Sequence, residues 1–267
     1  MKVTTPQCQS CGRKEAAYHI VNMNASGSEF HCCTDCWKKM KMAVRPDPDD
    51  FHHQLLSSLM KAAPRVTDRE GKIIRDHLIQ AIDAKMKMIA SLEFMDKVRD
   101  IADVMTTCLR RDGTIYACGS GACAGEARHL VTDLVGVHKL PARRGLPAVC
   151  IVACPTLMDD FSHEDMFVRQ VEALVSERDV LIGVSANGNS TSVVRALRKA
   201  AHQGAFTVGL TGADGGKMLD TTRLSLIAPS DQSPTIHECH TIAVHILCDL
   251  VEQALWHDSD NADPVMI

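Results

Sequence analysis

From about residue 114 onward, short apolar runs alternate with longer segments in which apolar residues recur every three or four positions. The apolar runs lie at 114–118, 149–153, 180–184, 206–210 and 224–227. The segments with helical spacing lie at 125–134, 163–175, 191–202 and 236–256, with a short helical turn at 216–220. Short apolar runs are typical of strands covered on both faces, and their alternation with helices requires parallel strands. The expected fold class is α/β, a doubly wound parallel sheet flanked by helices.

The region before the sheet divides into several parts. Residues 73–111 carry an apolar stripe rich in Met and predict two helices that break near Ser91, forming core or a subunit interface. The stretch 45–50, RPDPDD, is a linker, and 51–63 is a short amphipathic helix closed by Pro64. We therefore predict a small zinc-ribbon domain over 1–44, a linker with a short helix over 45–66, the main domain over 67–258 and a tail over 259–267.

The composition is that of an ordinary globular protein. Of 267 residues, 45% are hydrophobic and 23% are charged, and the net charge is −4. No apolar run reaches membrane-spanning length, and the N-terminus lacks the core of a signal peptide. We expect a cytoplasmic protein with no membrane contact. The mild acidity argues against a general nucleic-acid binder, although the first 45 residues carry a small excess of basic side chains.

Cysteine spacing predicts a zinc ribbon at the start of the chain. Twelve cysteines in a cytoplasmic protein are not explained by disulfides. Four of them form two CxxC pairs, Cys8–Cys11 and Cys33–Cys36, and such pairs complete a closed tetrahedral zinc site. Two alternatives stay open: a redox CxxC, and substitution of one ligand by His31 or Cys32. Cys118, Cys150, Cys154 and Cys248 are expected to be small buried hydrophobes.

The segment between the two pairs, with AAYHIVNM and SEFHC, predicts two strands joined by a turn at 24–27. Residues 7–40 resemble the module at the start of bacterial McsA-type kinase activators. That resemblance implies structural Zn²⁺ and a docking surface for a protein partner. A site closed by four cysteines has no open coordination position, so we expect no chemistry there.

A loop of small polar residues follows the strand predicted at 180–184. Ser185, Asn187, Asn189 and Ser190 surround Gly188, and a helix opens at Thr191. A glycine loop at a helix N-terminus directs several backbone N–H groups at one point and favours an anion there. The lysine-bearing GxxxxGK[ST] loop of nucleotide-binding proteins is absent. The loop is therefore either a phosphate cradle or an ordinary turn with Ser and Asn caps.

Several separated motifs resemble one family in the same order. CGSGACAGEARHLVTDLVG, VSANGNSTSVVRAL, GLTGADGGKM and IHECHTIAVHILCDLVE are similar to the sugar isomerase (SIS) domain, within it to the phosphoheptose isomerase branch. The resemblance runs from about residue 73 to 255. It implies the SIS fold, a phosphorylated sugar as substrate and a homotetramer with active sites at subunit interfaces.

The resemblance also implies catalytic positions. The family's HxxxE pair corresponds to His129 and Asp133, with the carboxylate as base, and its Gln and His on the terminal helix correspond to His237 and His245, the latter an acid or base. Some members hold zinc with these four positions. Three histidines and an aspartate favour Zn²⁺ or a similar divalent ion more than the family's own set. The alternative is that His237, His240 and His245 are polar residues at a helix interface.

Helix geometry sets a condition on this metal site. Eight helical residues rise about 12 Å, so His237 and His245 of one helix can hardly bind the same ion. Either the chain is not yet helical at His237, or neighbouring subunits contribute ligands. In addition, Asp133 is one methylene shorter than the family's glutamate, and a misplacement of about 1 Å can cost about a hundredfold in rate.

The same resemblance assigns substrate contacts to two glycine loops, an acidic position and the terminal helix. These residues are Ser120, Cys123, Asp160, Ser185, Asn187, Gly188, Asn189, Ser190 and His237. Cys123 stands where a serine is usual, and Ala186 and Asn187 each lose a hydroxyl. Because a thiol is a poor donor, Cys123 is alternatively a soft metal ligand. Asp160 is alternatively a helix N-cap.

These observations predict a ketose–aldose isomerase, with sedoheptulose 7-phosphate as substrate and D-glycero-manno-heptose 7-phosphate as product. A bound metal ion would assist this reaction. One alternative keeps the chemistry but changes the sugar. The other is a non-catalytic sugar-phosphate-binding regulatory or assembly protein that docks through the zinc ribbon.

Overall fold

The structure of this chain is a computed structural model, which describes residues 18–21, 29–32, 54, 56–58, 61, 67–154 and 161–256. The chain divides into two units, 1–64 and 65–267, which are described separately. The ribbon cysteines Cys8, Cys11, Cys33 and Cys36, most of the predicted linker, Asp160 and the tail lie outside the described residues.

The first unit contains a small antiparallel hairpin. Strand β1 (Tyr18–Val21) pairs with β2 (Glu29–Cys32), with Tyr18 opposite Cys32. Both strands fall within the segments predicted from sequence. The second cysteine pair of the predicted ribbon begins immediately after β2.

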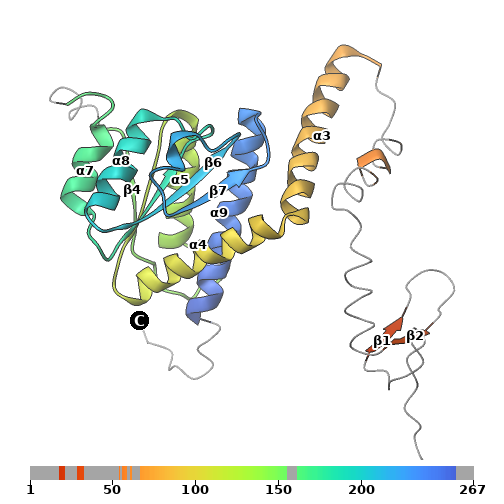
Figure 1. Cartoon of the computed structure of the whole chain (residues 1–267), viewed down its shortest axis with the longest axis horizontal. Helices are drawn as coiled ribbons and strands as arrows, with labels where there is room; N and C mark the ends of the chain where they lie inside the picture. The colour runs from red at the N-terminus through yellow and green to blue at the C-terminus, as the bar shows by residue number, and fades with distance from the viewer. Residues whose placement is uncertain are drawn as a thin grey trace, which may run out of the picture. The chain divides into compact units, whose positions relative to one another are not determined.

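The second unit is built on a five-stranded sheet (Figure 1). Its strands are β3 (Ile115–Gly119), β4 (Ala148–Ile151), β5 (Val180–Val184), β6 (Phe206–Gly212) and β7 (Leu224–Ala228). They lie in the order β4-β3-β5-β6-β7, and every neighbouring pair is parallel. The predicted parallel sheet is therefore confirmed. All residues of β3 and β5 are buried, because helices cover both faces of these central strands.

Helices cover the sheet in two layers. One layer holds α4 (Leu92–Arg110), α5 (Ala124–Val135) and α9 (Ser233–Trp256), and the other holds α7 (Met166–Leu174) and α8 (Thr191–His202). Short 3₁₀ turns η1 (Gly121–Cys123) and η2 (Gly216–Met218) follow β3 and β6. Each layer encloses its own apolar core against the sheet. Among the described helices, none is long and apolar enough to cross a membrane.

Helix α3 (Arg69–Ala90) stands away from the sheet in Figure 1 and is only partly packed. Ser91 ends α3 and starts α4, where its hydroxyl accepts a hydrogen bond from the Phe94 amide, so the predicted break is confirmed. Near this break, Met88 of α3 packs in a small cluster with Ile236 and Cys239 of α9. Toward its start, α3 instead exposes large apolar side chains.

Two expectations need adjustment. Cys118 and Cys248 are fully buried as predicted. Cys150 is partly exposed because β4 is an edge strand, and Cys154, which follows β4, is partly exposed as well. Helix α9 begins at Ser233, so the chain is already helical at His237. The geometric condition on His237 and His245 is therefore not relieved by an unwound segment.

Candidate active site

Parallel pairing brings the loops that follow the strands to one edge of the sheet. β3 runs into Ser120 and the turn that opens α5, and β5 runs into Ser185 and the loop that opens α8. In an open α/β sheet this carboxyl edge holds the ligand crevice. Two helix N-termini meet there, and their unpaired N–H groups favour negative charge.

The loop after β5 has a shape that requires glycine. Gly188 adopts a φ of +66°, and a Cβ on it would lie 1.8 Å from the carbonyl oxygen of Gly215. This close approach lets the Met218 amide donate to the Gly188 carbonyl at 3.0 Å. The loop after β5 and the loop after β6 therefore brace each other.

The two asparagines of this loop hold its shape. The Asn187 Oδ1 accepts from the Asn189 amide at 3.0 Å, and the Asn189 Oδ1 accepts from the Lys217 amide at 3.2 Å. Ser190 is the N-cap residue of α8 but makes no side-chain capping hydrogen bond. The asparagines therefore serve the loop itself, and the first turn of α8 keeps N–H groups directed at the crevice.

We expect Gly188→Ala to damage this loop. Alanine in a left-handed conformation costs about 1–3 kcal/mol, and the overlap with Gly215 adds to this. Thermal unfolding should show a lower midpoint, and ligand affinity should fall. Gly125→Ala is the matched control, because a Cβ there meets nothing within 4 Å. A Gly188→Ala protein as stable as the wild type would contradict the role of this glycine.

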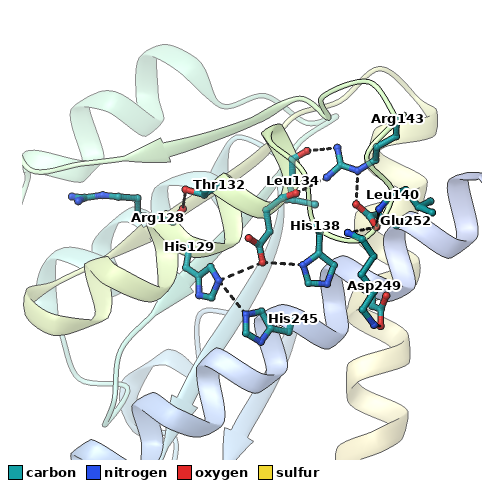
Figure 2. A network of polar contacts seen from close by, with 12 residues as sticks. Arg128, His129, Thr132, Leu134, His138, Leu140, Arg143, His245, Asp249 and Glu252 are labelled. Carbon is teal, nitrogen blue, oxygen red and sulfur yellow. Dashed lines mark hydrogen bonds and ion pairs between the residues drawn. The ribbon is translucent and has the colours of Figure 1, made fainter.

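A polar cluster joins α5 to α9 where the two helices pack against each other (Figure 2). The Nε2 atoms of His129 and His245 lie 3.1 Å apart, with their rings edge to face. Asp133 Oδ2 lies 3.4 Å from His129 Nε2. Spacing of four residues on α5 places His129 and Asp133 on one face, as the sequence predicted. Since two nitrogens at this distance share one proton, the imidazoles must hold complementary tautomers or bind a common cation.

His138 is a member of this cluster that sequence reasoning missed. Its Nδ1 lies 3.3 Å from Asp133 Oδ2, and its ring stacks on His245 with centroids 5.8 Å apart. The His138 Nε2 is buried and has no hydrogen-bond partner. His138 lies past the end of α5, so no helical periodicity pointed to it. The only sequence signal was a histidine five residues after the candidate base.

The main-chain carbonyl of Asp133 is held by a buried arginine, Arg143. Arg143 donates to the main-chain oxygens of Asp133 and Leu134, which have no partner within the last turn of α5. Glu252 of α9 accepts from Arg143 and from the amides of Lys139 and Leu140. This buried pair ties the segment after α5 to α9 and thereby sets the position of the carboxylate (Figure 2).

His237 does not join the other three predicted positions within one chain. Its Nδ1 lies 2.9 Å from Glu126 Oε1, near the start of α5 and next to Cys123. His240 points into the core, where its Nε2 donates to the Thr211 carbonyl at 2.9 Å. Burial lowers the pKa of His240 and keeps it neutral. Of the three histidines on α9, only His245 reaches the Asp133 cluster.

The donor set of this cluster fits a divalent ion. His129, Asp133 and His245 each offer one ligand atom, and these atoms lie within 4.8 Å of one another. Two imidazoles and a carboxylate are ligands that zinc accepts, and three protein ligands leave one position open. His138 lies beside this set, with its Nδ1 3.3 Å from Asp133 Oδ2.

Comparison with known proteins places the second unit in a family. The SIS domain model matches residues 78–212. A phosphoheptose isomerase from Helicobacter pylori strain P12 is 38% identical over 189 residues, which cover 69% of this chain and 97% of the relative. Among solved structures, a phosphoheptose isomerase from Francisella tularensis aligns with a TM-score of 0.66 and 26% identity, covering 70% of this chain and 100% of that one. One from Neisseria gonorrhoeae aligns with a TM-score of 0.63 and 29% identity, covering 68% and 98%.

Proposed function

Because this chain belongs to the SIS domain family and groups there with the phosphoheptose isomerases, we propose that it interconverts sedoheptulose 7-phosphate and D-glycero-manno-heptose 7-phosphate. The observation that carries this proposal is the gathering of His129, Asp133 and His245 where α5 packs on α9. An enediolate mechanism requires a general base and a group that both donates and accepts a proton, and a carboxylate beside two imidazoles in contact supplies both.

The reaction moves one proton from C1 to C2 of the ketose and another between the two oxygens. Asp133 takes the carbon-bound proton: one carboxylate oxygen faces the histidines, and the other is left for substrate. With no ion bound to its Nε2, His245 moves the proton between the oxygens, because its contact with His129 lets it either give or accept one. His138 and the main-chain anchor through Arg143 hold the carboxylate in place.

A divalent ion held by His129, Asp133 and His245 would polarise the substrate carbonyl and stabilise the negative charge that develops on its oxygen. The ion would supply only this polarisation, and binding and orientation of the sugar come from the chain itself. The N–H groups of α8, with Ser185 and Ser190, hold the phosphate, while Ser120 lies at the loop after β3.

Incubation of the purified protein with sedoheptulose 7-phosphate, with product identified by NMR, tests the proposal. We expect the aldoheptose phosphate to form. If the sugar phosphate stabilises the protein against heat but is never converted, with the metal content verified, the chain is a binding protein instead. Conversion of other ketose phosphates in preference to this one would change the sugar but keep the chemistry.

We also place a structural Zn²⁺ in the N-terminal unit and assign it a docking role toward a protein partner. The β1–β2 hairpin lies between the two CxxC pairs, as in a zinc ribbon, and supports this proposal. Elemental analysis of a Cys8→Ser, Cys11→Ser protein should show one zinc fewer per chain than the wild type.

A homotetramer is the assembly we propose, and α3 supplies part of its interface. Ile74, Leu78, Ile82 and Ile89 form one stripe along α3 and are 39–70% exposed. A contiguous apolar stripe of this kind marks an association surface. The stripe is the strongest sign of association on the described second unit.

Leu78→Glu is expected to dissociate the assembly, because it buries an unpaired charge in the interface. Light scattering after size-exclusion chromatography should show smaller species than the wild type. Gln80→Glu is the matched control, since it adds the same charge to an exposed position of α3 outside the stripe. An unchanged molar mass for Leu78→Glu would exclude this surface.

A further inference from the structure

A second cluster of metal-ligating side chains lies between the start of α5 and the first turns of α9, on the N-terminal side of Asp133 along α5. Cys123, Glu126 and His237 each offer a ligand atom, and these atoms all lie within 4.8 Å of one another. Glu126 Oε1 and His237 Nδ1 are already 2.9 Å apart. The cluster is largely buried: Cys123 is 5% exposed, and the side chains of Glu126 and His237 are 11% and 21% exposed.

One buried oxygen atom in this cluster lacks a hydrogen-bond partner, which favours a bound ligand. The Glu126 Oε2 is buried and has no hydrogen-bond partner, although a buried carboxylate oxygen is costly to leave unpaired. The single contact to His237 meets only one of its two oxygens. A cation would satisfy the orphaned oxygen and replace the proton shared with the histidine.

Position along the helices explains how the ligands could be charged. Cys123 is the N-cap residue of α5, and Glu126 lies in its first turn. A helix N-terminus favours a thiolate and a carboxylate, which are the ionised forms that bind metal. Burial raises the pKa of the Cys123 thiol, with a hydrogen bond from the Ala186 backbone acting against this. A bound cation would supply the missing stabilisation of the thiolate.

The two clusters would differ in net charge once each held a divalent ion. A thiolate, a carboxylate and a neutral imidazole neutralise a divalent cation, so the ion would carry no net charge into a buried place. The set of His129, Asp133 and His245 leaves one positive charge, which suits the negative charge that forms on a substrate oxygen. The sulfur ligand favours zinc, and three protein ligands leave one coordination position open.

We propose that Cys123, Glu126 and His237 form a second divalent-metal site of zinc type, separate from the site of His129, Asp133 and His245. Because His237 and His245 lie two turns apart on α9, about 12 Å along its axis, one ion does not bind both histidines of the same chain. The site ties the start of α5 to the first turns of α9 at the crevice. It does not depend on the isomerase activity.

Cobalt titration of the metal-free, full-length protein tests the site, because a cobalt–thiolate bond has a characteristic near-ultraviolet absorption. We expect Cys123→Ser and His237→Gln to bind one Co²⁺ fewer per chain than the wild type. Cys123→Ser should also lose part of the thiolate absorption, and the part that remains comes from the N-terminal cysteines. His129→Gln should lose a Co²⁺ without loss of that absorption.

Cys150→Ser is the matched control, because Cys150 is a partly exposed cysteine on β4 outside the cluster. It should bind as many Co²⁺ ions as the wild type, with the same absorption. Equal binding and absorption in Cys123→Ser, His237→Gln and the wild type would overturn the proposal. If Cys123→Ser fails to fold, anomalous diffraction from zinc-grown crystals of the wild type decides: a peak between Cys123, Glu126 and His237 supports the site, and its absence refutes it.

Discussion

Asp133→Asn should lower kcat for sedoheptulose 7-phosphate by about 10²–10⁴-fold, which is the usual contribution of a general base. The amide keeps the size of the side chain, and the main-chain anchor to Arg143 is unaffected, so folding should be preserved. The proton transfer itself can be followed in D₂O. The wild type should introduce deuterium from solvent into the substrate or product, and the variant should do so far more slowly.

Two further variants serve as controls for the Asp133→Asn measurement. Asp133→Glu restores the carboxylate on a side chain one methylene longer, so we expect it to stay within about a hundredfold of the wild type. Asp103→Asn removes an exposed carboxylate on α4 and should leave turnover unchanged. Wild-type turnover in Asp133→Asn would remove Asp133 from the catalytic role and leave the fold assignment intact.

The Glu252→Gln protein should be about 3–5 kcal/mol less stable to unfolding, because it leaves Arg143 buried without its counter-charge. The two side chains are only 1% and 2% exposed, so water does not screen the loss. For a domain of this size we expect the melting midpoint to fall by about 6–20 °C. Turnover should fall as well, since Arg143 also holds the Asp133 carbonyl.

A neighbouring pair on the same two segments supplies the control. Lys139 and Asp249 form an ion pair whose lysine is 61% exposed, and Asp249→Asn should cost no more than about 1 kcal/mol. Differential scanning calorimetry compares the three proteins. An equal loss for Asp249→Asn and Glu252→Gln would contradict the importance of burial.

The same pair predicts a dependence on acid. Burial opposes ionisation of Glu252, but hydrogen bonds from Arg143 and two backbone amides, together with the Arg143 charge, hold its pKa below the usual value. A carboxyl whose pKa is lowered on folding stabilises the protein above its unfolded pKa of about 4.3 and loses this contribution as the pH falls through the folded value. The stability difference between wild type and Glu252→Gln should therefore be full at neutral pH and shrink below about pH 4.

Local patterns were sufficient for the order of the elements. The run 180–184 and the segment 191–202 became β5 and α8 with the predicted bounds, because a strand covered on both faces and an amphipathic helix leave clear periodic signals. Helix α9 begins three residues earlier than predicted, at Ser233, where polar residues hide the start. The zinc-binding roles of the four ribbon cysteines rest on their spacing in the sequence and stay predictions.

The candidate site could be predicted only where its residues share one helix. His129 and Asp133 are four residues apart on α5, so their common face followed from the helical repeat. His245 was assigned by resemblance, and its contact with His129 joins residues 116 positions apart. No local rule links such distant positions.

What the sequence by itself determined was the alternation of strands and helices, the glycine loops at the strand ends and the chemical types of the ligands, since these depend on neighbours along the chain. The tertiary structure decided which side chains meet. Packing of α5 and the segment after it against α9 brought His129 and His138 to His245. The same packing placed His237 against Glu126, away from His245, and paired Arg143 with Glu252. These contacts depend on how two helices are placed on a shared sheet, which only the packing of the whole domain determines.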